Sequence, residues 1–246
     1  MTAPRAQRPI KAIFFDLDDT LLDDTISSER SAAHVAAELA GDRGAGPDDL
    51  AIAYMEEAMA FWERLAPGAP KPPSGAIRPA LWRAALARFG IDDAGLATRL
   101  AERYDAVRVE RVELFPETLP VLHELHGRYK MAIITNGFAE THEAKIARLE
   151  LSRFFDTVVL AGEMQLAKPD PAAFRHAMDA LAVTAAESVM VGDRYDRDIV
   201  GAHAAGMRSI WVNSRRETMP PGAQPPDAEI PSIAGLPEAL VHLQER

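Results

Sequence analysis

The residues best suited to chemistry are carboxylates that follow a short apolar run near the start of the chain. Residues 13–15 are Ile-Phe-Phe, and Asp16, Asp18 and Asp19 follow closely. Such a run predicts a buried strand, and ligands bind at the carboxyl ends of strands in an open α/β sheet. These acids cannot all be buried and ionised, because like charges repel and desolvation is costly. A metal ion would relieve both problems, so we expect a metal-assisted site here.

The first two acids have a spacing that suits paired roles. Asp16 and Asp18 are separated by one residue, so their side chains project to the same face if the strand pleat continues through them. One carboxylate can then act as a nucleophile while its neighbour moves a proton.

A second motif combines a hydroxyl group with a tight turn. Thr135 ends a short apolar segment and is followed by Asn136 and Gly137, with a helical pattern beyond them. A turn of this kind offers the hydroxyl and backbone N–H groups to an anion, because they lie close to a helix N-terminus. Thr135 and Asn136 are therefore candidate anion-binding residues.

Two later motifs supply a cation and further acids. Lys168 is followed by Pro169, and Asp193 and Asp198 follow another apolar segment. A fixed ammonium group can neutralise a phosphoryl group during transfer, and carboxylate oxygens suit Mg²⁺ better than zinc. Because parallel strands bring their carboxyl ends to one edge, we expect these motifs to share one crevice.

A charge count supports a metal ion. Four carboxylates (Asp16, Asp18, Asp193 and Asp198) and one ammonium (Lys168) carry a net charge of −3. A phosphate dianion would not enter such a site unaided, whereas a divalent cation brings the sum to −1 and protonation of Asp18 brings it to zero. We therefore predict that metal and substrate bind together.

The elements that must position these residues follow from the hydrophobic pattern. Short apolar segments predict strands at residues 11–15, 131–134, 157–160, 188–191 and 209–212. Amphipathic segments predict helices at residues 117–129, 139–149, 171–181, 199–205 and 237–244. Strands that alternate with helices are typical of a parallel sheet, so the fold class is α/β. The proline-rich residues 215–231 predict a loop.

A long helical stretch separates the first strand from the second. Apolar residues recur at helical spacing in residues 32–39, 55–65, 81–89 and 96–107, and the proline-rich residues 67–79 predict a loop among them. This pattern predicts a small helical bundle inserted after the first strand. His34, Trp62, Arg64, Arg78 and Trp82 lie in it, where packing or a solvated helix face is a simpler interpretation than substrate binding.

Taken together, the four motifs resemble those of the haloacid dehalogenase-like hydrolase superfamily. Their order and spacing match along nearly the whole chain after its first residues. The resemblance implies a Rossmann-like parallel-sheet core with an inserted α-helical cap domain. The expected division is a disordered leader at residues 1–9, a core at residues 10–22 and 113–246, and a cap at residues 23–112.

The same resemblance implies a Mg²⁺-dependent hydrolase of small phosphate monoesters that forms an aspartyl-phosphate on Asp16. Asp18 would protonate the leaving oxygen and then activate water. Thr135 and Asn136 would bind phosphate, and Lys168 would steady both the phosphate and the nucleophile.

The implied metal ligands are Asp16, Asp18 through its carbonyl group, and Asp193, with Asp198 near the metal or Lys168. Asp196 remains a rival for that last position.

Several other functions can be weighed on particular residues. The dehalogenases of this superfamily lack the aspartate found here as Asp18. Phosphonate hydrolases of the superfamily use a cap lysine. The only lysine between residues 23 and 115 is Lys71, in the proline-rich predicted loop, which argues against that chemistry. A sugar-phosphate mutase uses the same motifs and stays open. So does a non-enzymatic phosphate-sensing protein, although a receiver-like switch lacks a large helical insert.

Composition narrows the partners. The chain has 246 residues, a formal net charge of −10, 48% hydrophobic residues and no cysteine. No long basic run or membrane-length apolar segment is present, which argues against nucleic acid and membrane partners. The absence of cysteine rules out a disulfide framework and a thiolate nucleophile. We expect a cytoplasmic protein that acts on a small phosphorylated metabolite; the sequence leaves its oligomeric state open.

Overall fold

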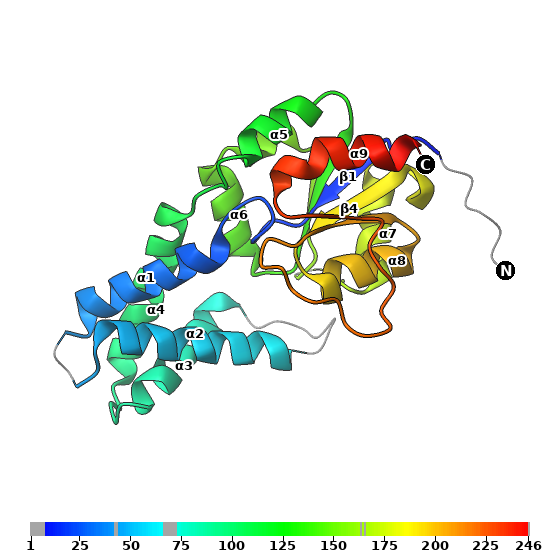
Figure 1. Cartoon of the computed structure of the whole chain (residues 1–246). Helices are drawn as coiled ribbons and strands as arrows, with labels where there is room; N and C mark the ends of the chain where they lie inside the picture. Colours follow the sequence, from blue (N-terminus) through cyan, green and yellow to red (C-terminus); the bar gives the residue numbers. More distant parts are fainter. Residues whose placement is uncertain (1–7, 42–43, 66–72, 163, 165, 246) are drawn as a thin grey trace.

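The computed structural model describes residues 8–41, 44–65, 73–162, 164 and 166–245 (Figure 1). In this part of the chain, six parallel strands form one sheet in the order β3-β2-β1-β4-β5-β6. The strands are β1 (Ala12–Phe15), β2 (Lys130–Thr135), β3 (Thr157–Leu160), β4 (Ser188–Gly192), β5 (Arg208–Val212) and β6 (Ala228–Ile230). The prediction of an α/β fold with a parallel sheet is confirmed.

Helices cover both faces of the sheet, which explains why its central strands are apolar on both sides. On one face pack α5 (Thr118–Leu125), α6 (Ala139–Arg148) and α9 (Leu236–Glu245), and on the other pack α7 (Pro171–Ala180) and α8 (Val200–Ala205) (Figure 1). Along β1 the side chains alternate between these two layers, Ile13 and Phe15 facing one and Ala12 and Phe14 the other.

The strand order places the motif residues at one edge. The central strand β1 pairs with β2 on one side and with β4 on the other. The chain therefore turns to opposite sides of the sheet at this point, and such a switch opens a crevice beyond the carboxyl ends of the strands. Asp16, Asn136 and Asp193 each follow one of these three strands directly.

Four helices follow β1 before the chain returns to the sheet, and Figure 1 shows them as a separate layer beside it. They are α1 (Asp24–Leu39), α2 (Pro47–Arg64), α3 (Ser74–Ala87) and α4 (Ala94–Arg111). Their buried apolar residues form one cluster of their own, which includes Tyr54, Trp82, Leu100 and Val107. The predicted helical insertion is confirmed.

The expected leader at residues 1–9 lies mostly outside the described residues, and so does Lys71. Arg8 and Pro9, which are described, are exposed and outside any helix or strand.

Two predicted loops are wrong in part. Residues 67–79 were expected to be irregular, but α3 begins at Ser74 and contains Pro79. Glu140 of α6 stabilises the start of α3, because its carboxylate accepts hydrogen bonds from both the backbone N–H and the hydroxyl of Ser74. Residues 215–231 were expected to be a loop, but they contain β6, which pairs with β5. Only three residues long, β6 lies at the sheet edge, where pairing and not periodicity creates the strand.

Among the helices that the structure describes, none combines the length and the apolar character that a membrane span requires.

Candidate active site

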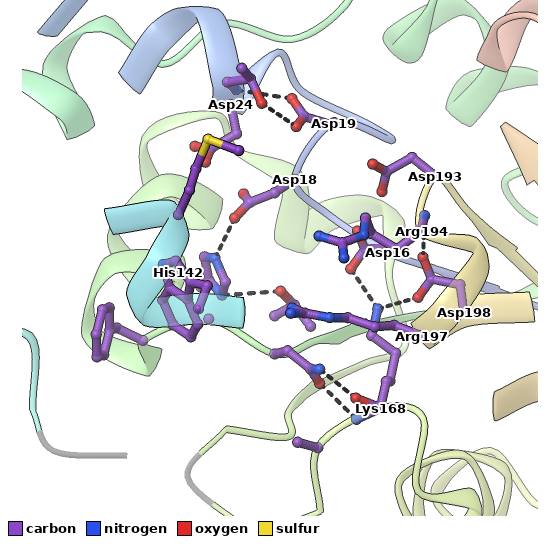
Figure 2. A pocket seen from close by; sticks show the side chains of 18 of the residues that line it. Asp16, Asp18, Asp19, Asp24, His142, Lys168, Asp193, Arg194, Arg197 and Asp198 are labelled. Carbon is purple, nitrogen blue, oxygen red and sulfur yellow. Dashed lines mark hydrogen bonds and ion pairs between the residues drawn. The ribbon is translucent and has the colours of Figure 1, made fainter. Parts of the chain in front are cut away.

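A cavity of about 630 Å³ lies at the carboxyl edge of the sheet, between the sheet and the inserted helices (Figure 2). Every side chain that the sequence nominated for catalysis, phosphate binding or metal binding lines it. These residues are Asp16, Asp18, Thr135, Asn136, Lys168, Asp193 and Asp198. The topology thus brings together residues from the two ends of the chain, as the parallel sheet requires.

Lys168 joins two of the acids. Its Nζ lies 2.6 Å from Asp16 Oδ1 and 2.6 Å from Asp198 Oδ1. Burial lowers the pKa of Lys168, but the attraction of the two carboxylates outweighs it and raises the pKa above its usual value. The lysine therefore stays charged in a buried position, and its ammonium group is fixed beside the carboxylate of Asp16.

Three acids form a compact group around this lysine. Ligand oxygens of Asp16, Asp193 and Asp198 all lie within 4.8 Å of one another. Burial, opposed by Lys168 and reinforced by the other acids, raises the pKa of Asp16 to about 7. Burial and repulsion from Asp16 and Asp198 raise the pKa of Asp193 to about 9.

Such a group fits a hard divalent cation, because its donors are carboxylate oxygens and their mutual repulsion is not neutralised by Lys168 alone. Asp198 rather than Asp196 belongs to it. The Asp198 side chain is buried, whereas Asp196 is 62% exposed and accepts two hydrogen bonds from the Arg194 guanidinium.

The backbone of Asp193 is held by residues from two other segments of the chain. The backbone N–H of Asp193 donates to Thr20 Oγ1 at 3.0 Å, and its carbonyl oxygen accepts from Trp211 Nε1 at 2.8 Å. Thr20 follows the first acidic motif and Trp211 lies on β5. These bonds fix the backbone from which the Asp193 carboxylate projects.

Two motif glycines are required by close side-chain approach. A Cβ atom on Gly192 would lie 2.2 Å from Asp198 Oδ2, and one on Gly137 would lie 1.9 Å from Cε1 of the His142 ring. Both distances are far below van der Waals contact. The absence of a side chain at Gly192 therefore makes room for Asp198.

The side chain of Asp18 points away from the acid group. Strand β1 ends at Phe15, so the pleat does not continue and the conditional expectation that Asp16 and Asp18 share a face is not met. Asp18 Oδ1 accepts from Lys145 Nζ at 2.7 Å, and Asp18 Oδ2 lies 2.9 Å from His142 Nε2. Both partners belong to α6.

These contacts shift the pKa of Asp18 in the opposite direction to that of Asp16. Burial raises the pKa of Asp18, but the attraction of Lys145 and the hydrogen bond from His142 outweigh it and hold the pKa well below its usual range. The charge count allowed a protonated Asp18; in this structure the carboxylate is ionised.

His142 connects Asp18 to Thr135. Burial lowers the pKa of His142 despite the attraction of Asp18, so the ring is neutral at pH 7. An ionised carboxylate only accepts hydrogen bonds, so Nε2–H donates to Asp18 and Nδ1 accepts from Thr135 Oγ1 at 3.1 Å. The Thr135 hydroxyl must rotate away from His142 before it donates to a phosphate oxygen.

The Asn136 side chain is engaged with the backbone of Lys168. Its Nδ2 donates to the Lys168 carbonyl oxygen and its Oδ1 accepts from the Lys168 N–H, both at 2.8 Å. This pair of bonds ties the end of β2 to the loop that carries the lysine. Asn136 lines the cavity, as expected, but direct phosphate binding by its side chain stays a prediction.

His142 and Lys145 were missed by the sequence reasoning. They lie one helical turn apart on α6, and both are fully or almost fully buried, together with Ile146. A histidine and a lysine on the apolar face of a helix that follows a site motif are the signal that could have identified them.

Asp19 has a structural position. Its backbone is left-handed, with φ of 58°. Its carboxylate accepts from the Thr25 N–H at 2.9 Å and from Arg215 Nη2 at 2.7 Å. Asp19 therefore joins the start of α1 to the segment after β5.

The residues singled out in the insertion differ in position. Trp62 lines the cavity and packs against Phe138 with ring centroids 5.1 Å apart. Trp82 is buried and stacks on Tyr54, and Arg78 is buried against Asp105 and Thr141. These contacts favour packing for Trp82 and Arg78, as expected, and place Trp62 at the cavity wall. His34 and Arg64 do not line the cavity.

Comparison with known proteins identifies the class. The family model described as haloacid dehalogenase-like hydrolase matches residues 10–206, which is most of the chain. The chain therefore belongs to the haloacid dehalogenase-like hydrolase family, as its motifs indicated, and it is an enzyme of that family.

Two curated relatives cover almost the whole chain. N-acylneuraminate-9-phosphatase of Mus musculus is 29% identical and covers 94% of this chain and 94% of the relative. Phosphoserine phosphatase of Thermus thermophilus is 33% identical and covers 88% of this chain and 94% of the relative. The chain thus has phosphatase homologues over most of its length.

Two solved structures have the same fold. The magnesium-bound HAD-hydrolase YfnB of Bacillus subtilis aligns with a TM-score of 0.78 at 21% identity, over 97% of this chain and 100% of that one. A 2-haloacid dehalogenase of Pseudomonas syringae aligns with a TM-score of 0.68 at 32% identity, over 95% of this chain and 99% of that one. Both alignments extend through the helical insertion.

Proposed function

We propose that this enzyme is a phosphatase that hydrolyses a small phosphate monoester with Mg²⁺, through an aspartyl-phosphate on Asp16. The observation that carries the proposal is the buried carboxylate of Asp16 on the cavity wall, held at 2.6 Å by the Lys168 ammonium group within a group of three acids. The cavity thus combines an oxygen that can attack phosphorus, a fixed cation and carboxylates suited to a divalent metal ion.

In the first step, an oxygen of Asp16 attacks phosphorus and the bond to the ester oxygen breaks. Lys168 neutralises charge on the phosphoryl oxygens and steadies Asp16. Thr135 binds the phosphate through its hydroxyl once that group leaves His142. Asn136 holds the Lys168 loop, and backbone N–H groups of the turn after β2 complete the phosphate site.

Asp18 moves the protons. It gives a proton to the leaving oxygen in the first step. In the second step its carboxylate takes a proton from the water that attacks phosphorus, which frees phosphate and restores Asp16. The low pKa of Asp18 suits the second step. For the first step, a substrate dianion beside Asp18 favours uptake of the required proton, because a nearby negative charge raises a carboxyl pKa.

The residues that would hold Mg²⁺ are Asp16 and Asp193 through their carboxylates and Asp18 through its carbonyl group. Asp198 lies beside them and holds Lys168 in place. When bound, the ion supplies positive charge that draws the phosphate to the carboxylates and stabilises charge on its oxygens.

The relatives support a substrate class. The two curated relatives act on phosphorylated metabolites, and we propose the same class here. We also propose that residues 23–112 form a cap over a core made of residues 10–22 and 113–246. The side chains of Met59 and Trp62 on α2 face the cavity from the cap side, where the leaving group must lie.

The test is to trap the intermediate. Wild-type enzyme, Mg²⁺ and a ³²P-labelled phosphate ester, quenched in acid, should give an acid-stable, alkali-labile label on the protein. Asp16→Asn should give no label and lose turnover by at least ~10³-fold with an unchanged circular dichroism spectrum. Label or near-normal turnover in Asp16→Asn would contradict the nucleophile assignment.

A mutase that uses the same residues is separated by its product. A phosphatase releases one inorganic phosphate for each ester consumed, whereas a mutase returns the phosphoryl group to the sugar. Measuring released phosphate against consumed ester decides between the two.

A further inference from the structure

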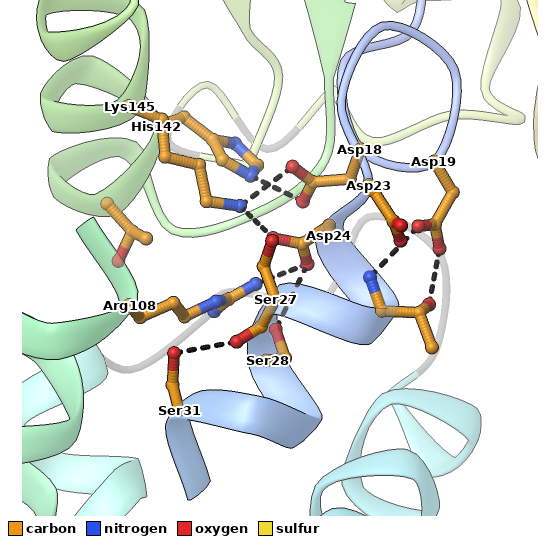
Figure 3. Close-up of polar contacts among 12 residues, drawn as sticks. Asp18, Asp19, Asp23, Asp24, Ser27, Ser28, Ser31, Arg108, His142 and Lys145 are labelled. Carbon is orange, nitrogen blue, oxygen red and sulfur yellow. Dashed lines mark hydrogen bonds and ion pairs between the residues drawn. The ribbon is translucent and has the colours of Figure 1, made fainter. Parts of the chain in front are cut away.

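Lys145 is a fully buried cation that the mechanism above does not use. Its side chain is 0% exposed, and its Nζ donates to Asp18 Oδ1 at 2.7 Å and to Asp24 Oδ1 at 2.5 Å (Figure 3). One of these acceptors follows the central strand of the sheet, and the other is the first residue of the first inserted helix. A single ammonium group therefore joins the core to the insertion.

The contact belongs to a longer series of alternating charges, which we call the linking chain: Arg108, Asp24, Lys145 and Asp18. Beyond Asp24 lies Arg108 of α4, whose guanidinium pairs with the other oxygen of Asp24. Figure 3 shows Arg108, Asp24, Lys145 and Asp18 in sequence, with His142 holding the second oxygen of Asp18. The four residues come from α4, α1, α6 and the segment after β1. Their charges sum to zero, so the linking chain is neutral without an added ion.

The linking chain fixes the position of the Asp18 carboxylate. Lys145 and His142 take one oxygen each, so the carboxylate has two anchors on the same helix, at 2.7 Å and 2.9 Å. It lies on the cavity wall away from the group of Asp16, Asp193 and Asp198, towards the insertion (Figure 2). In the proposed function, the leaving group of an ester attacked by Asp16 lies on that side, where Met59 and Trp62 line the cavity.

We infer that Lys145 is a positioning residue for the proposed reaction: it holds the Asp18 carboxylate beside the leaving oxygen and couples that placement to the first inserted helix through Asp24. The inference rests on the proposed function, because it needs Asp18 to act on the leaving group. Lys145 itself does not line the cavity, so it acts through Asp18 and not by touching the substrate.

Leaving-group dependence separates positioning from mere support of the fold. p-Nitrophenyl phosphate releases a stabilised phenolate that departs without a proton, whereas O-phosphoserine releases an alkoxide that needs one. A residue that only supports the fold affects both esters equally. A residue that places the proton donor affects the alkyl ester far more, so the ratio of kcat/KM for the aryl ester to that for the alkyl ester rises.

The experiment measures this ratio in the full-length enzyme with Mg²⁺ for wild type, Asp18→Asn, Lys145→Met and Lys145→Gln. General acid assistance contributes roughly 10²- to 10⁴-fold, so Asp18→Asn should raise the ratio by about that factor. Lys145→Met should raise it about 10-fold or more, through kcat for O-phosphoserine, with KM and inhibition by inorganic phosphate unchanged within about twofold. Lys145→Gln keeps a hydrogen-bond donor and should raise the ratio by a smaller factor.

Lys130→Met is the matched control, because Lys130 Nζ donates to the Leu181 carbonyl oxygen at the far end of β2; its ratio should equal that of wild type. Lys145→Gln carries the test if Lys145→Met does not fold. If Asp18→Asn raises the ratio while both folded Lys145 variants leave it unchanged, the inference is overturned and the proposed function stands. If Asp18→Asn itself leaves the ratio unchanged, the proton-transfer role of Asp18 fails, and the inference with it.

Discussion

The molecule places two groups of buried or partly buried charges side by side, and the two groups differ in their balance of charge. In the acid group, Asp16, Asp193 and Asp198 share the single ammonium of Lys168. In the linking chain, Asp18 and Asp24 are matched by Lys145 and Arg108. The pKa of Asp16 rises to about 7, while that of Asp18 lies well below its usual range.

The difference shows how one short segment places two carboxyl groups in opposite electrostatic environments. Asp16 and Asp18 are separated by one residue, yet their surroundings push their pKa values apart, which is the pattern expected of a site that needs two carboxyl groups with distinct tasks. The acid group carries more negative than positive charge, and in the proposed function a divalent cation from outside the protein completes it. The linking chain is complete within the protein and holds its carboxylate in place.

The largest expected effect comes from withholding that outside cation. Treatment with EDTA should lower the initial rate of phosphate release by at least ~10³-fold, and Mg²⁺ should restore it. The linking chain should not respond, so circular dichroism should report the same helix content with and without the ion. Full activity in chelator would show that Lys168 alone is sufficient.

The next effect concerns stability. Lys145→Met removes the buried cation that the linking chain shares and leaves the partly buried carboxylates of Asp18 and Asp24 without it. Loss of one partner from a buried ion pair costs roughly 3–5 kcal/mol, and urea unfolding should show a loss of that size. Lys130→Met, which breaks only a hydrogen bond to a carbonyl oxygen, should cost about 1 kcal/mol. Similar losses in the two variants would mean that the linking chain is not a charge-dependent structure.

In the metal-free enzyme, ionisation of the acid group should lower the stability of the fold. The folded-state pKa values of Asp16 and Asp193 are raised from 3.8 to about 7 and about 9. The folded state then binds more protons than the unfolded state between pH 4 and 9, so stability is greatest at the low end and falls as pH rises.

We therefore expect the Tm of metal-free protein to fall between pH 5 and pH 9. Asp193→Asn removes one repelling carboxylate and should reduce that slope while weakening Mg²⁺ binding. Scanning calorimetry at several pH values measures the first effect and titration calorimetry the second. A Tm that rises over this range would contradict the description of the acid group as short of positive charge.

The smallest effect is expected at Asp196, the rival of Asp198. Its side chain is 62% exposed and pairs with Arg194 on the surface, and substitutions of this kind change stability by about 0.5 kcal/mol or less. Asp196→Asn should keep the Mg²⁺ affinity of the wild type within about twofold. A large loss of affinity in this variant would exchange the roles of Asp196 and Asp198.

Much of the fold could be predicted from local pattern. The apolar segments that became β1, β2, β3, β4 and β5 stand out because strands buried on both faces have no polar alternation. Strand β6 was missed because Ala228–Ile230 is too short to show a period and is defined by its pairing with β5. The start of α3 was missed for a similar reason, since contacts from Ser74 to Glu140 on a distant helix support it.

The sequence by itself determined which residues meet in the cavity, because parallel strands bring their carboxyl ends to one edge and the motifs follow those strands. It could not determine what surrounds each of them. The partner of Asp18 is Lys145, 127 residues away in the sequence, and the room for Asp198 depends on the missing side chain of Gly192. Electrostatic environment depends on distance in space and on burial, so only the tertiary structure decided that two acids separated by one residue would differ in their partners and in pKa.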